Sequence, residues 1–183
     1  MTTETNTTLP AGTRVAFLLT NGYEDSELTS PWDAVAAAGG EPVLVSPITD
    51  EVEGKKGHTQ GVDLPVAEAS AGDFAGLVLP GGVVNGDKLR MERDAVNLVR
   101  EFFTQHKPVA VICHGGWILT DAQVLSGRMM TSYPSLRTDL RNAGATWVDE
   151  EVVVDQHLVS SRRPDDLPAF NAAFLRLLAE ATS

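Results

Sequence analysis

The sequence has 183 residues, 43% of them hydrophobic, with one cysteine and a formal net charge of −11. Its length predicts a single domain with a sizeable core. The acidic charge disfavours nucleic acid as a partner, because phosphate backbones would be repelled. We expect no membrane association, since there is no apolar run of about 18 residues and no secretory leader. A lone thiol cannot form an internal disulfide and suits a reducing compartment, so we predict a cytoplasmic protein.

Strand-length apolar runs alternate with helical patterns along the chain. A polar, Thr-rich and mobile tail is expected over residues 1–12, followed by a single domain over residues 13–183. The expected strands are 14–20, 42–46, 76–79, 108–112, 128–131, 146–148, 152–155 and 158–160, with a hairpin or excursion over 52–64. The expected helices are 24–38, 94–105, a short one after residue 116, 135–143 and 165–181. This alternation predicts an α/β fold whose mostly parallel sheet is covered on both faces.

Three segments rich in polar residues and glycine follow predicted strands, namely 21–27, 80–87 and 113–116. Because the carboxyl ends of parallel strands gather at one edge of such a sheet, we expect these segments to meet there and form the functional site. No internal repeat or second domain is visible that would place a site elsewhere.

Cys113 is the strongest candidate for a reactive residue at that edge. It directly follows an apolar strand and precedes two glycines and a helix, so it is expected on a sharp strand-to-helix turn. The free N–H groups and positive dipole end of the helix would favour the thiolate, which predicts a lowered thiol pKa and raised reactivity. The alternative is a buried, inert cysteine.

Candidate partners of Cys113 come from its own turn and from the first helix. His114 is expected to act as a general base or ion-pair partner if its orientation brings it to the thiol, and is otherwise a polar residue at a helix start. Glu24, buried beside the thiolate, would be pushed towards its protonated form and could donate a hydrogen bond to the sulfur. Compensation of the helix dipole is the alternative, and Asp25 and Glu27 are placed equally well for it.

The turn after the third strand supplies further candidates. Gly81 and Gly82 can aim backbone N–H groups at an oxyanion, although a glycine pair is also an ordinary turn. Asp87 lies just beyond, either on a surface turn or as an acid that orients His114.

The remaining chemistry-bearing residues give weaker signals. The other three histidines are scattered without the spacing of metal ligands, so we expect neither a metal site nor a cofactor. Trp117 either lines the pocket or fills the core. The Arg162-Arg163 pair before Pro164 is interpreted as a solvated corner rather than an anion site.

Several motifs occur together in one order along the chain. They are Asn21–Leu28 (NGYEDSEL), Leu79–Gly82 (LPGG), Asn85–Arg90, Ala110–Gly115 (AVICHG), Thr131–Pro134 (TSYP), Arg141–Val148 (RNAGATWV) and Val152–Pro164 (VVVDQHLVSSRRP). In this combination the chain resembles the ThiJ/PfpI superfamily, specifically its branch of PfpI-type intracellular proteases and general stress proteins. The resemblance covers nearly the whole chain and implies a flavodoxin-like three-layer α/β sandwich with a cysteine nucleophile elbow.

The resemblance also implies roles for the residues around the elbow. It makes Cys113 the reactive cysteine, Glu24 the carboxyl beside it and His114 the neighbouring histidine. The N–H groups of Gly82 and His114 would form the oxyanion site.

Two further implications concern the surroundings of the pocket. Asp87, one methylene shorter than the glutamate of some members, would complete a Cys-His-acid triad from the adjoining subunit, which implies a homodimer or a larger homo-oligomer. Tyr133 would lie near the pocket, and bulky Trp117 would narrow it against a polypeptide.

Functions of different classes follow from these residues. The first is a stress-response cysteine hydrolase in which Cys113 attacks an electrophilic carbonyl. In a deglycase or glyoxalase, that carbonyl belongs to a small dicarbonyl or to its adduct on an amine. In a peptidase, it belongs to a peptide bond. The second is a non-catalytic redox sensor whose Cys113 is oxidised to a sulfenic or sulfinic acid stabilised by Glu24, with no second cysteine to resolve it. A folded relative without activity is the third possibility.

Overall fold

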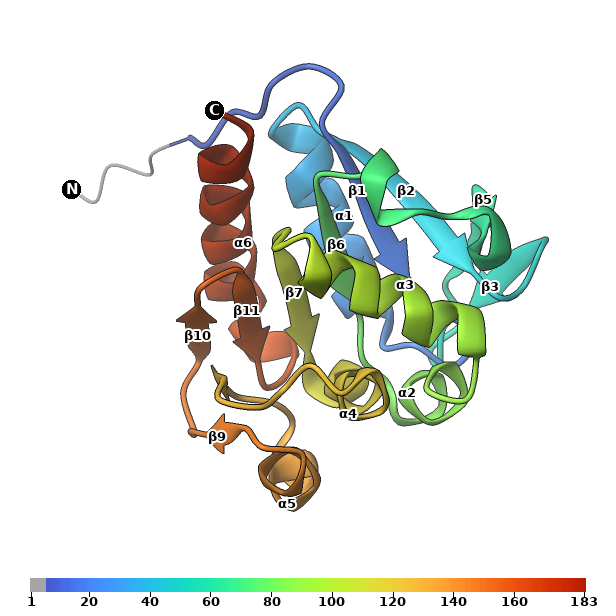
Figure 1. Ribbon diagram of the computed structural model, residues 1–183. Coiled ribbons are helices and arrows are strands. Elements are labelled where there is room, and N and C mark those ends of the chain that lie inside the picture. Colours follow the sequence, from blue (N-terminus) through green and yellow to red (C-terminus); the bar gives the residue numbers. More distant parts are fainter. Residues whose placement is uncertain (1–5) are drawn as a thin grey trace.

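The computed structural model describes residues 6–183 as an α/β sandwich around one seven-stranded sheet (Figure 1). Its strands are β1 (Arg14–Leu18), β2 (Glu41–Ser46), β5 (Leu64–Pro65), β6 (Gly76–Leu79), β7 (Val109–Ile112), β10 (Val152–Asp155) and β11 (Leu158–Ser161). They lie in the order β10-β11-β7-β6-β1-β2-β5. Every neighbouring pair is parallel except β10 and β11, so the predicted mostly parallel sheet is confirmed.

Helices cover both faces of the sheet. They are α1 (Asp25–Ala37), α2 (Val83–Leu89), α3 (Arg93–Thr104), α4 (Trp117–Ala122), α5 (Arg137–Asn142) and α6 (Leu167–Thr182), with 3-10 helices η1 (Val66–Glu68), η2 (Ala71–Asp73), η3 (Cys113–Gly116), η4 (Pro134–Leu136) and η5 (Pro164–Asp166). Helices α1 and α6 pack on one face, and α3 and α4 pack on the other (Figure 1). These three layers form the expected flavodoxin-like sandwich. Within residues 6–183, none of the helices has the length and apolar character needed to cross a membrane.

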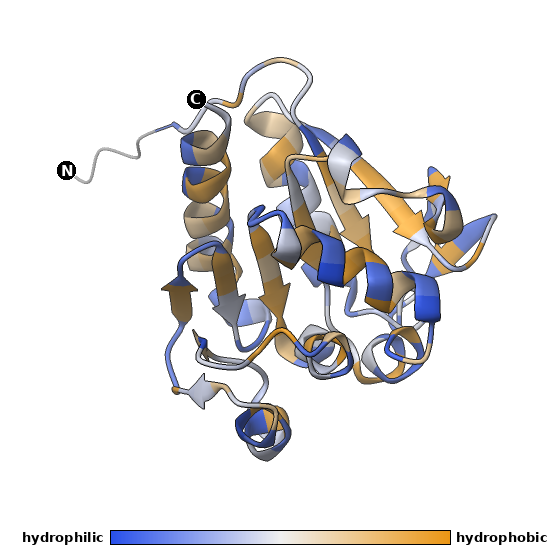
Figure 2. Ribbon diagram, viewed as in Figure 1, coloured by the Kyte–Doolittle hydropathy of each residue, from blue (hydrophilic) through white to orange (hydrophobic). Residues whose placement is uncertain are grey.

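The two faces of the sheet bury alternate residues of the same strands, as a pleated strand requires. In β1, Ala16 and Leu18 pack in the cluster with α3, whereas Val15 and Phe17 pack in the cluster with α1 and α6. All four side chains are fully buried. A strand buried on both faces is a continuous apolar run in the sequence, and Figure 2 shows the central strands as mostly hydrophobic.

Two pairs of short strands lie outside the main sheet. β3 (Glu51–Glu53) and β4 (Thr59–Gly61) form the antiparallel hairpin expected over 52–64. β8 (Met129–Met130) pairs in parallel with β9 (Thr146–Trp147). The β3–β4 hairpin carries two lysines, Lys55 and Lys56, in its turn, and these reach the functional site described below.

Helix α2 is an element that the sequence analysis does not anticipate. The sequence Asn85–Asp87 is typical of a surface turn, but these residues lie inside α2, which corrects that interpretation. Asn85 is fully buried. Its Oδ1 accepts a hydrogen bond from the Thr20 N–H at 2.8 Å, and its Nδ2 donates to the Pro80 and Gly81 carbonyls at 3.1 and 3.0 Å. Contact with a strand end distant in sequence, rather than local propensity, fixes this stretch of chain.

The N-terminal segment joins the fold at Leu9. Residues 1–5 of the expected mobile tail lie outside the described part of the chain. Leu9 is buried, and its N–H donates to the Ala38 carbonyl just after α1 at 2.7 Å. The packed part of the chain therefore begins before Gly12.

The carboxyl ends of β1, β6 and β7 point towards the same end of the molecule, where α2 and α4 lie (Figure 1). The segments that follow these three strands therefore come together, as the parallel sheet predicts. The turn after β6 contacts both α1 and the turn after β7, since Gly81 lies against Glu27 and Cys113.

Candidate active site

Cys113 stands at the turn between β7 and α4, as the first residue of η3. Its φ is +60°, a left-handed conformation that costs about 1–3 kcal/mol for a residue with a side chain. The sharp strand-to-helix turn expected at this position is therefore present. The residue is 8% exposed and lines the cavity described below, so the thiol is largely shielded from solvent.

The turn after β6 packs against Cys113 and requires its two glycines. A Cβ on Gly81 would lie 2.5 Å from Glu27 Oε1 and 2.7 Å from Cys113 Cβ, too close for any side chain. Gly82 has a φ of +92°, which glycine adopts without a steric penalty. The backbone N–H groups of Gly82 and His114 lie near enough to the Cys113 thiol to favour its ionised form. Two backbone donors therefore lie beside the reactive atom.

Glu27 supplies the buried carboxyl beside Cys113. It is fully buried in α1, and its Oε1 accepts a hydrogen bond from the Gly81 N–H at 2.9 Å. Its Oε2 has no hydrogen-bond partner among residues 6–183, and the carboxyl neighbours the thiol. Burial raises the pKa of Glu27 to about 8, because a charged carboxylate loses its hydration there. Glu27 is therefore mostly protonated at neutral pH and can act as a hydrogen-bond donor.

Glu24 is buried but does not fill the role expected of it. Its carboxylate forms ion pairs with Lys55 and, at 2.9 Å, with Lys56. Burial alone would raise the pKa of Glu24, but the hydrogen bonds and charges of the two lysines hold it below its usual value. Glu24 is therefore ionised, and the expectation of a protonated Glu24 donating to the sulfur is wrong. The lysines of the β3–β4 hairpin, which the sequence did not connect to Glu24, are the reason.

The pKa of the Cys113 thiol is raised to about 12, not lowered as expected. Burial is the largest cause, followed by the negative charge of Glu27, and both outweigh the N–H groups of His114 and Gly82 and the charge of Lys55. A charged thiolate and a charged carboxylate cannot both be stable in one buried site. The thiolate therefore requires Glu27 to keep its proton.

His114 reaches the thiol in spite of being adjacent in sequence. Its Nδ1 lies 3.2 Å from Cys113 Sγ, and its Nε2 lies 3.2 Å from Ser135 Oγ. The imidazole is stacked on Tyr133, with ring centroids 4.7 Å apart, and meets the edge of Trp117 at 5.3 Å. Burial, and then the charge of Lys55, lower the pKa of His114, so the ring is neutral and can accept a proton. Ser135, whose role no sequence signal indicated, fixes its orientation.

Asp87 is not brought together with these residues. Its side chain is exposed on α2. Within residues 6–183, no hydrogen bond or ion pair joins Asp87 to His114, whose two ring nitrogens are taken up by Cys113 and Ser135. The place that the resemblance gives Asp87, in the triad of an adjoining subunit, stays a prediction.

The cavity above Cys113 is small, and charged groups stand in a wall that is more apolar than polar. It has a volume of about 300 Å³, and its walls include Glu24, Lys55, Cys113, His114, Tyr133 and Arg163. Tyr133, predicted to lie near the pocket, is 40% exposed in its wall. Trp117, which the sequence marked as a candidate pocket residue, is not among the residues that line the cavity. Its ring contacts the His114 ring, and its Nε1–H donates to Asp139 at 3.0 Å. The arrangement can bind a small molecule directly over the thiol.

The Arg162-Arg163 pair is not the solvated corner that the sequence suggested. Arg162 is bonded to Asp166 at 3.0 and 3.1 Å and to Asp149 at 2.9 Å. Arg163 lines the cavity, and its Nε is buried. The pair sits at the end of β11, beside the carboxyl end of β7, so the sheet topology brings it to the site.

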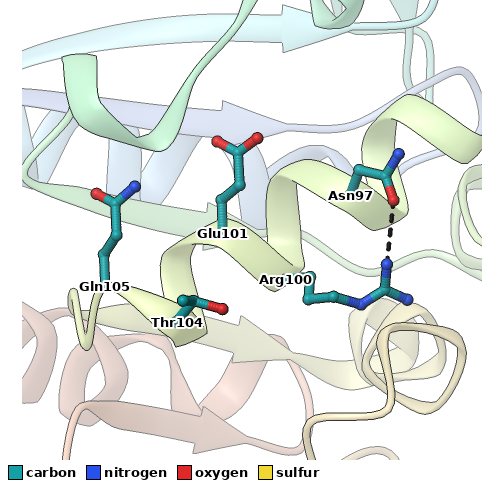
Figure 3. Close-up of a pocket in the computed structure, with 5 residues that line it drawn as sticks. All are labelled: Asn97, Arg100, Glu101, Thr104 and Gln105. Atoms are coloured by element: carbon teal, nitrogen blue, oxygen red, sulfur yellow. Dashed lines mark hydrogen bonds between the residues drawn. The ribbon is translucent and has the colours of Figure 1, made fainter.

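A second hollow, of about 360 Å³, lies along the outer side of α3 (Figure 3). Four of its five lining residues belong to that helix, and the fifth, Gln105, directly follows it. Figure 3 shows the hydrogen bond between Asn97 and Arg100, which is 3.1 Å long. It contains no cysteine nucleophile, so the smaller cavity at Cys113 is the candidate site. Among residues 6–183, no cluster of three or more His, Cys, Asp or Glu side chains is placed to hold a metal ion.

Comparisons with known proteins find a family profile and similar proteins that cover most of the chain. Residues 13–177 match the profile of the DJ-1/PfpI family. The chain is similar to Deglycase PfpI of Pyrococcus furiosus, with 44% identity over 165 residues that cover 90% of this chain and 99% of that protein. It is also similar to General stress protein 18 of Bacillus subtilis, with 44% identity over 170 residues that cover 91% of this chain and 98% of that protein.

A solved structure extends the comparison to the fold. A two-domain protein from Anabaena variabilis, containing DJ-1/ThiJ/PfpI-like and ferritin-like domains, matches with a TM-score of 0.88 and 36% identity. The match covers 91% of this chain and 48% of that longer chain. The likeness therefore concerns one domain of the Anabaena protein.

Proposed function

Since the chain belongs to the DJ-1/PfpI family, we propose that it is a stress-response cysteine hydrolase with deglycase activity. Its substrates are small dicarbonyls and the adducts that they form with amines or thiols. The observation that supports this most directly is Cys113 at a left-handed elbow, with His114 Nδ1 at 3.2 Å and a small cavity above the thiol. The names of two similar proteins, Deglycase PfpI and General stress protein 18, support the same function.

The first chemical step follows from the positions of Cys113 and His114. His114 Nδ1 takes the thiol proton as Sγ adds to the carbonyl carbon, so the thiolate does not have to persist unprotected in the buried site. The carbonyl oxygen gains negative charge and is stabilised by the N–H groups of Gly82 and His114. Protonated Glu27 adds no negative charge beside the sulfur.

The cavity favours small carbonyl compounds over polypeptides. Its volume of about 300 Å³ is at the lower end of the range of about 300–1,000 Å³ for small-molecule sites. Tyr133 and Arg163 stand in its wall, where an extended peptide would need an open groove. Peptidase activity, which the sequence left open, stays a prediction with weaker support.

We propose that a second copy of the chain covers α2. Val83, Val84 and Met91, in or just after this helix, are 53%, 49% and 82% exposed, and such a group of apolar side chains favours an interface. Val83 also lines the cavity, so the partner would sit at the mouth of the site. Asp87, on the same helix, would then be supplied to the neighbouring site. We place this homo-oligomer in the cytoplasm, where its lone thiol stays reduced.

The deciding experiment measures methylglyoxal consumption and 2-hydroxy acid formation by the wild type and by Cys113→Ala. We expect the variant to lose at least about 100-fold in kcat/KM, because the nucleophile is gone, while circular dichroism and the melting temperature show that it is folded. Equal rates in the two proteins would refute the mechanism.

The wild type and Cys113→Ala also distinguish a redox sensor from the proposed hydrolase. Quantitative oxidation of Cys113 by peroxide, without turnover of any dicarbonyl by the wild type, would favour the sensor. The contact of Cys113 with Glu27 supports this alternative, because a protonated carboxyl can donate a hydrogen bond to a sulfinate oxygen.

A further inference from the structure

Arg163 lines the cavity, and its Nε has no hydrogen-bond partner in the described part of the chain. Among residues 6–183, this N–H is buried and makes no hydrogen bond. A buried, unpaired donor is uncommon and costs about 1–3 kcal/mol. The neighbouring Asp166 is close enough for Arg163 to help lower its pKa, but both of its carboxylate oxygens are bonded to Arg162. No group among residues 6–183 therefore accepts a hydrogen bond from Arg163 Nε.

The backbone holds Arg163 in this position. Its φ and ψ are −161° and 171°, and it precedes Pro164, which also lines the cavity. A residue before proline is restricted to extended conformations, so the chain cannot easily turn Arg163 into the following helix. The backbone of Arg163 is therefore restricted to an extended conformation at the cavity wall.

The charges around the cavity do not balance. Glu24 is the negative group in its wall, and it is paired with both Lys55 and Lys56. Among the residues that line the cavity, two cations, Lys55 and Arg163, stand beside one ionised carboxylate, Glu24. The lining therefore carries an excess of one positive charge, which favours an anionic ligand.

We propose that Arg163 binds a carboxylate on the substrate, so that the preferred substrates are dicarbonyl adducts whose amine or thiol part carries a free carboxylate, as in adducts of small amino or mercapto acids. This rests on the proposed deglycase function and names its substrate class. The guanidinium group of Arg163 belongs to the cavity wall, and its planar set of N–H donors matches the two oxygens of a carboxylate. Arg163 would bind the carboxylate while Cys113 Sγ attacks the carbonyl carbon of the same molecule.

The test compares two substrates that differ only in this charge. They are the hemithioacetals of methylglyoxal with N-acetylcysteine and with N-acetylcysteine amide, assayed at equal concentrations of free methylglyoxal. We expect the wild type to prefer the carboxylate substrate, and Arg163→Gln to reduce that preference by about 10- to 100-fold, mainly through KM, as expected for a charge-assisted pair of hydrogen bonds. Arg163→Lys should restore part of the preference, because lysine keeps the positive charge but lacks the planar guanidinium that binds both carboxylate oxygens.

The matched control is Arg176→Gln, which removes the same charge from an exposed position on α6. It should leave the preference of the wild type unchanged. An equal loss on both substrates in Arg163→Gln, or a wild type without preference for the carboxylate, would overturn the proposal.

A binding measurement separates this inference from the proposed function. N-acetylglycine should protect Cys113 of the wild type against iodoacetamide, N-acetylglycinamide should not, and Arg163→Gln should abolish the protection. If neither hemithioacetal is turned over but this protection pattern holds, the deglycase function fails and the carboxylate site stands. If Arg163→Gln instead changes the oligomeric mass and N-acetylglycine gives no protection, Arg163 is satisfied by a second copy and the proposal is wrong.

Discussion

At the scale of single residues, two glutamates three positions apart carry opposite ionisation states. Glu24 stands at the start of α1 and meets the charges of Lys55 and Lys56, which hold its pKa below the usual value despite burial. Glu27 points into the space between α1 and the elbow, where burial raises its pKa to about 8. One glutamate therefore adds charge to the cavity wall and the other keeps a proton beside Cys113.

Replacing Glu27 tests whether its carboxyl raises the pKa of the Cys113 thiol. As pH rises through about 8, Glu27 ionises and then opposes ionisation of Cys113, which keeps the thiol pKa high. Glu27→Gln can still accept the Gly81 N–H but cannot become charged. We expect the midpoint of the pH profile of iodoacetamide alkylation to fall by at least about one unit, with faster alkylation of the variant at alkaline pH.

The control for this measurement is Glu180→Gln, which removes a carboxylate from an exposed position on α6. Its alkylation profile should coincide with that of the wild type. A profile of Glu27→Gln that does not move, or moves to higher pH, would remove Glu27 from the electrostatics of the site.

What the sequence revealed at this scale was the reactive position and not its protonation chemistry. Cys113 could be picked out because a strand, a cysteine, two glycines and a helix follow one another locally. Glu24 and Glu27 could not be distinguished, since their pKa values depend on lysines in a distant hairpin and on the packing of Gly81. Ser135 carries no local pattern at all.

At the scale of elements, the joint between β1, β6 and α2 holds the elbow in place. Asn85 connects the end of β1 to the turn after β6 through three buried hydrogen bonds. Gly86, the next residue, packs so closely that a Cβ there would lie 2.6 Å from the His114 carbonyl oxygen. Helix α2 therefore positions both the oxyanion donors and the histidine.

Asn85→Ala should weaken this joint and the activity together. The change removes the partners of the Thr20 N–H and the Pro80 carbonyl in a buried place, while the Gly81 carbonyl keeps its hydrogen bond from the Glu24 N–H. We therefore expect the free energy of unfolding to fall by about 1–3 kcal/mol. We also expect kcat to fall in protein that is still folded, because the Gly81-Gly82 turn loses its support. Urea denaturation and steady-state kinetics measure the two effects.

Asn97→Ala provides the comparison, since Asn97 is exposed on α3 and bonds only to Arg100 among the described side chains. Its effect should stay within about 0.5 kcal/mol. If Asn85→Ala were equally mild, the three hydrogen bonds would not be what holds the turn.

The limits of prediction at this scale have a common cause. The buried strands were predictable, because strands covered on both faces are uninterrupted apolar runs. Helix α2 was not, since an Asn-Gly pair is typical of a turn and only the long-range bond to Thr20 makes Asn85 a buried residue. The same applies to Arg163, which the topology of β11 carries to the site.

At the scale of the whole molecule, the parallel sheet brings the loops of the site together at one edge. Helix α2 presents exposed apolar side chains beside that site. The meeting of the three loops at one edge could be predicted from the alternation of strands and helices alone. The acid of the expected triad could not be placed, because Asp87 is exposed and has no contact with His114 in a single chain. The exposed Val83, Val84 and Met91 around it are the reason to look for that contact between chains.

Mixing subunits tests whether Asp87 acts across an interface. Cys113→Ala is expected to be inactive and Asp87→Asn impaired, because His114 loses its acid. In a mixed dimer, the intact Cys113 of one chain meets the intact Asp87 of the other, so equal amounts of the two variants should recover about one quarter of the wild-type sites by random pairing. Mixing Asp87→Asn with the double variant Cys113→Ala/Asp87→Asn supplies no intact Asp87 and should recover nothing. Recovery in both mixtures, or in neither while size-exclusion chromatography shows exchange of subunits, would mean that Asp87 does not complete the site of a neighbour.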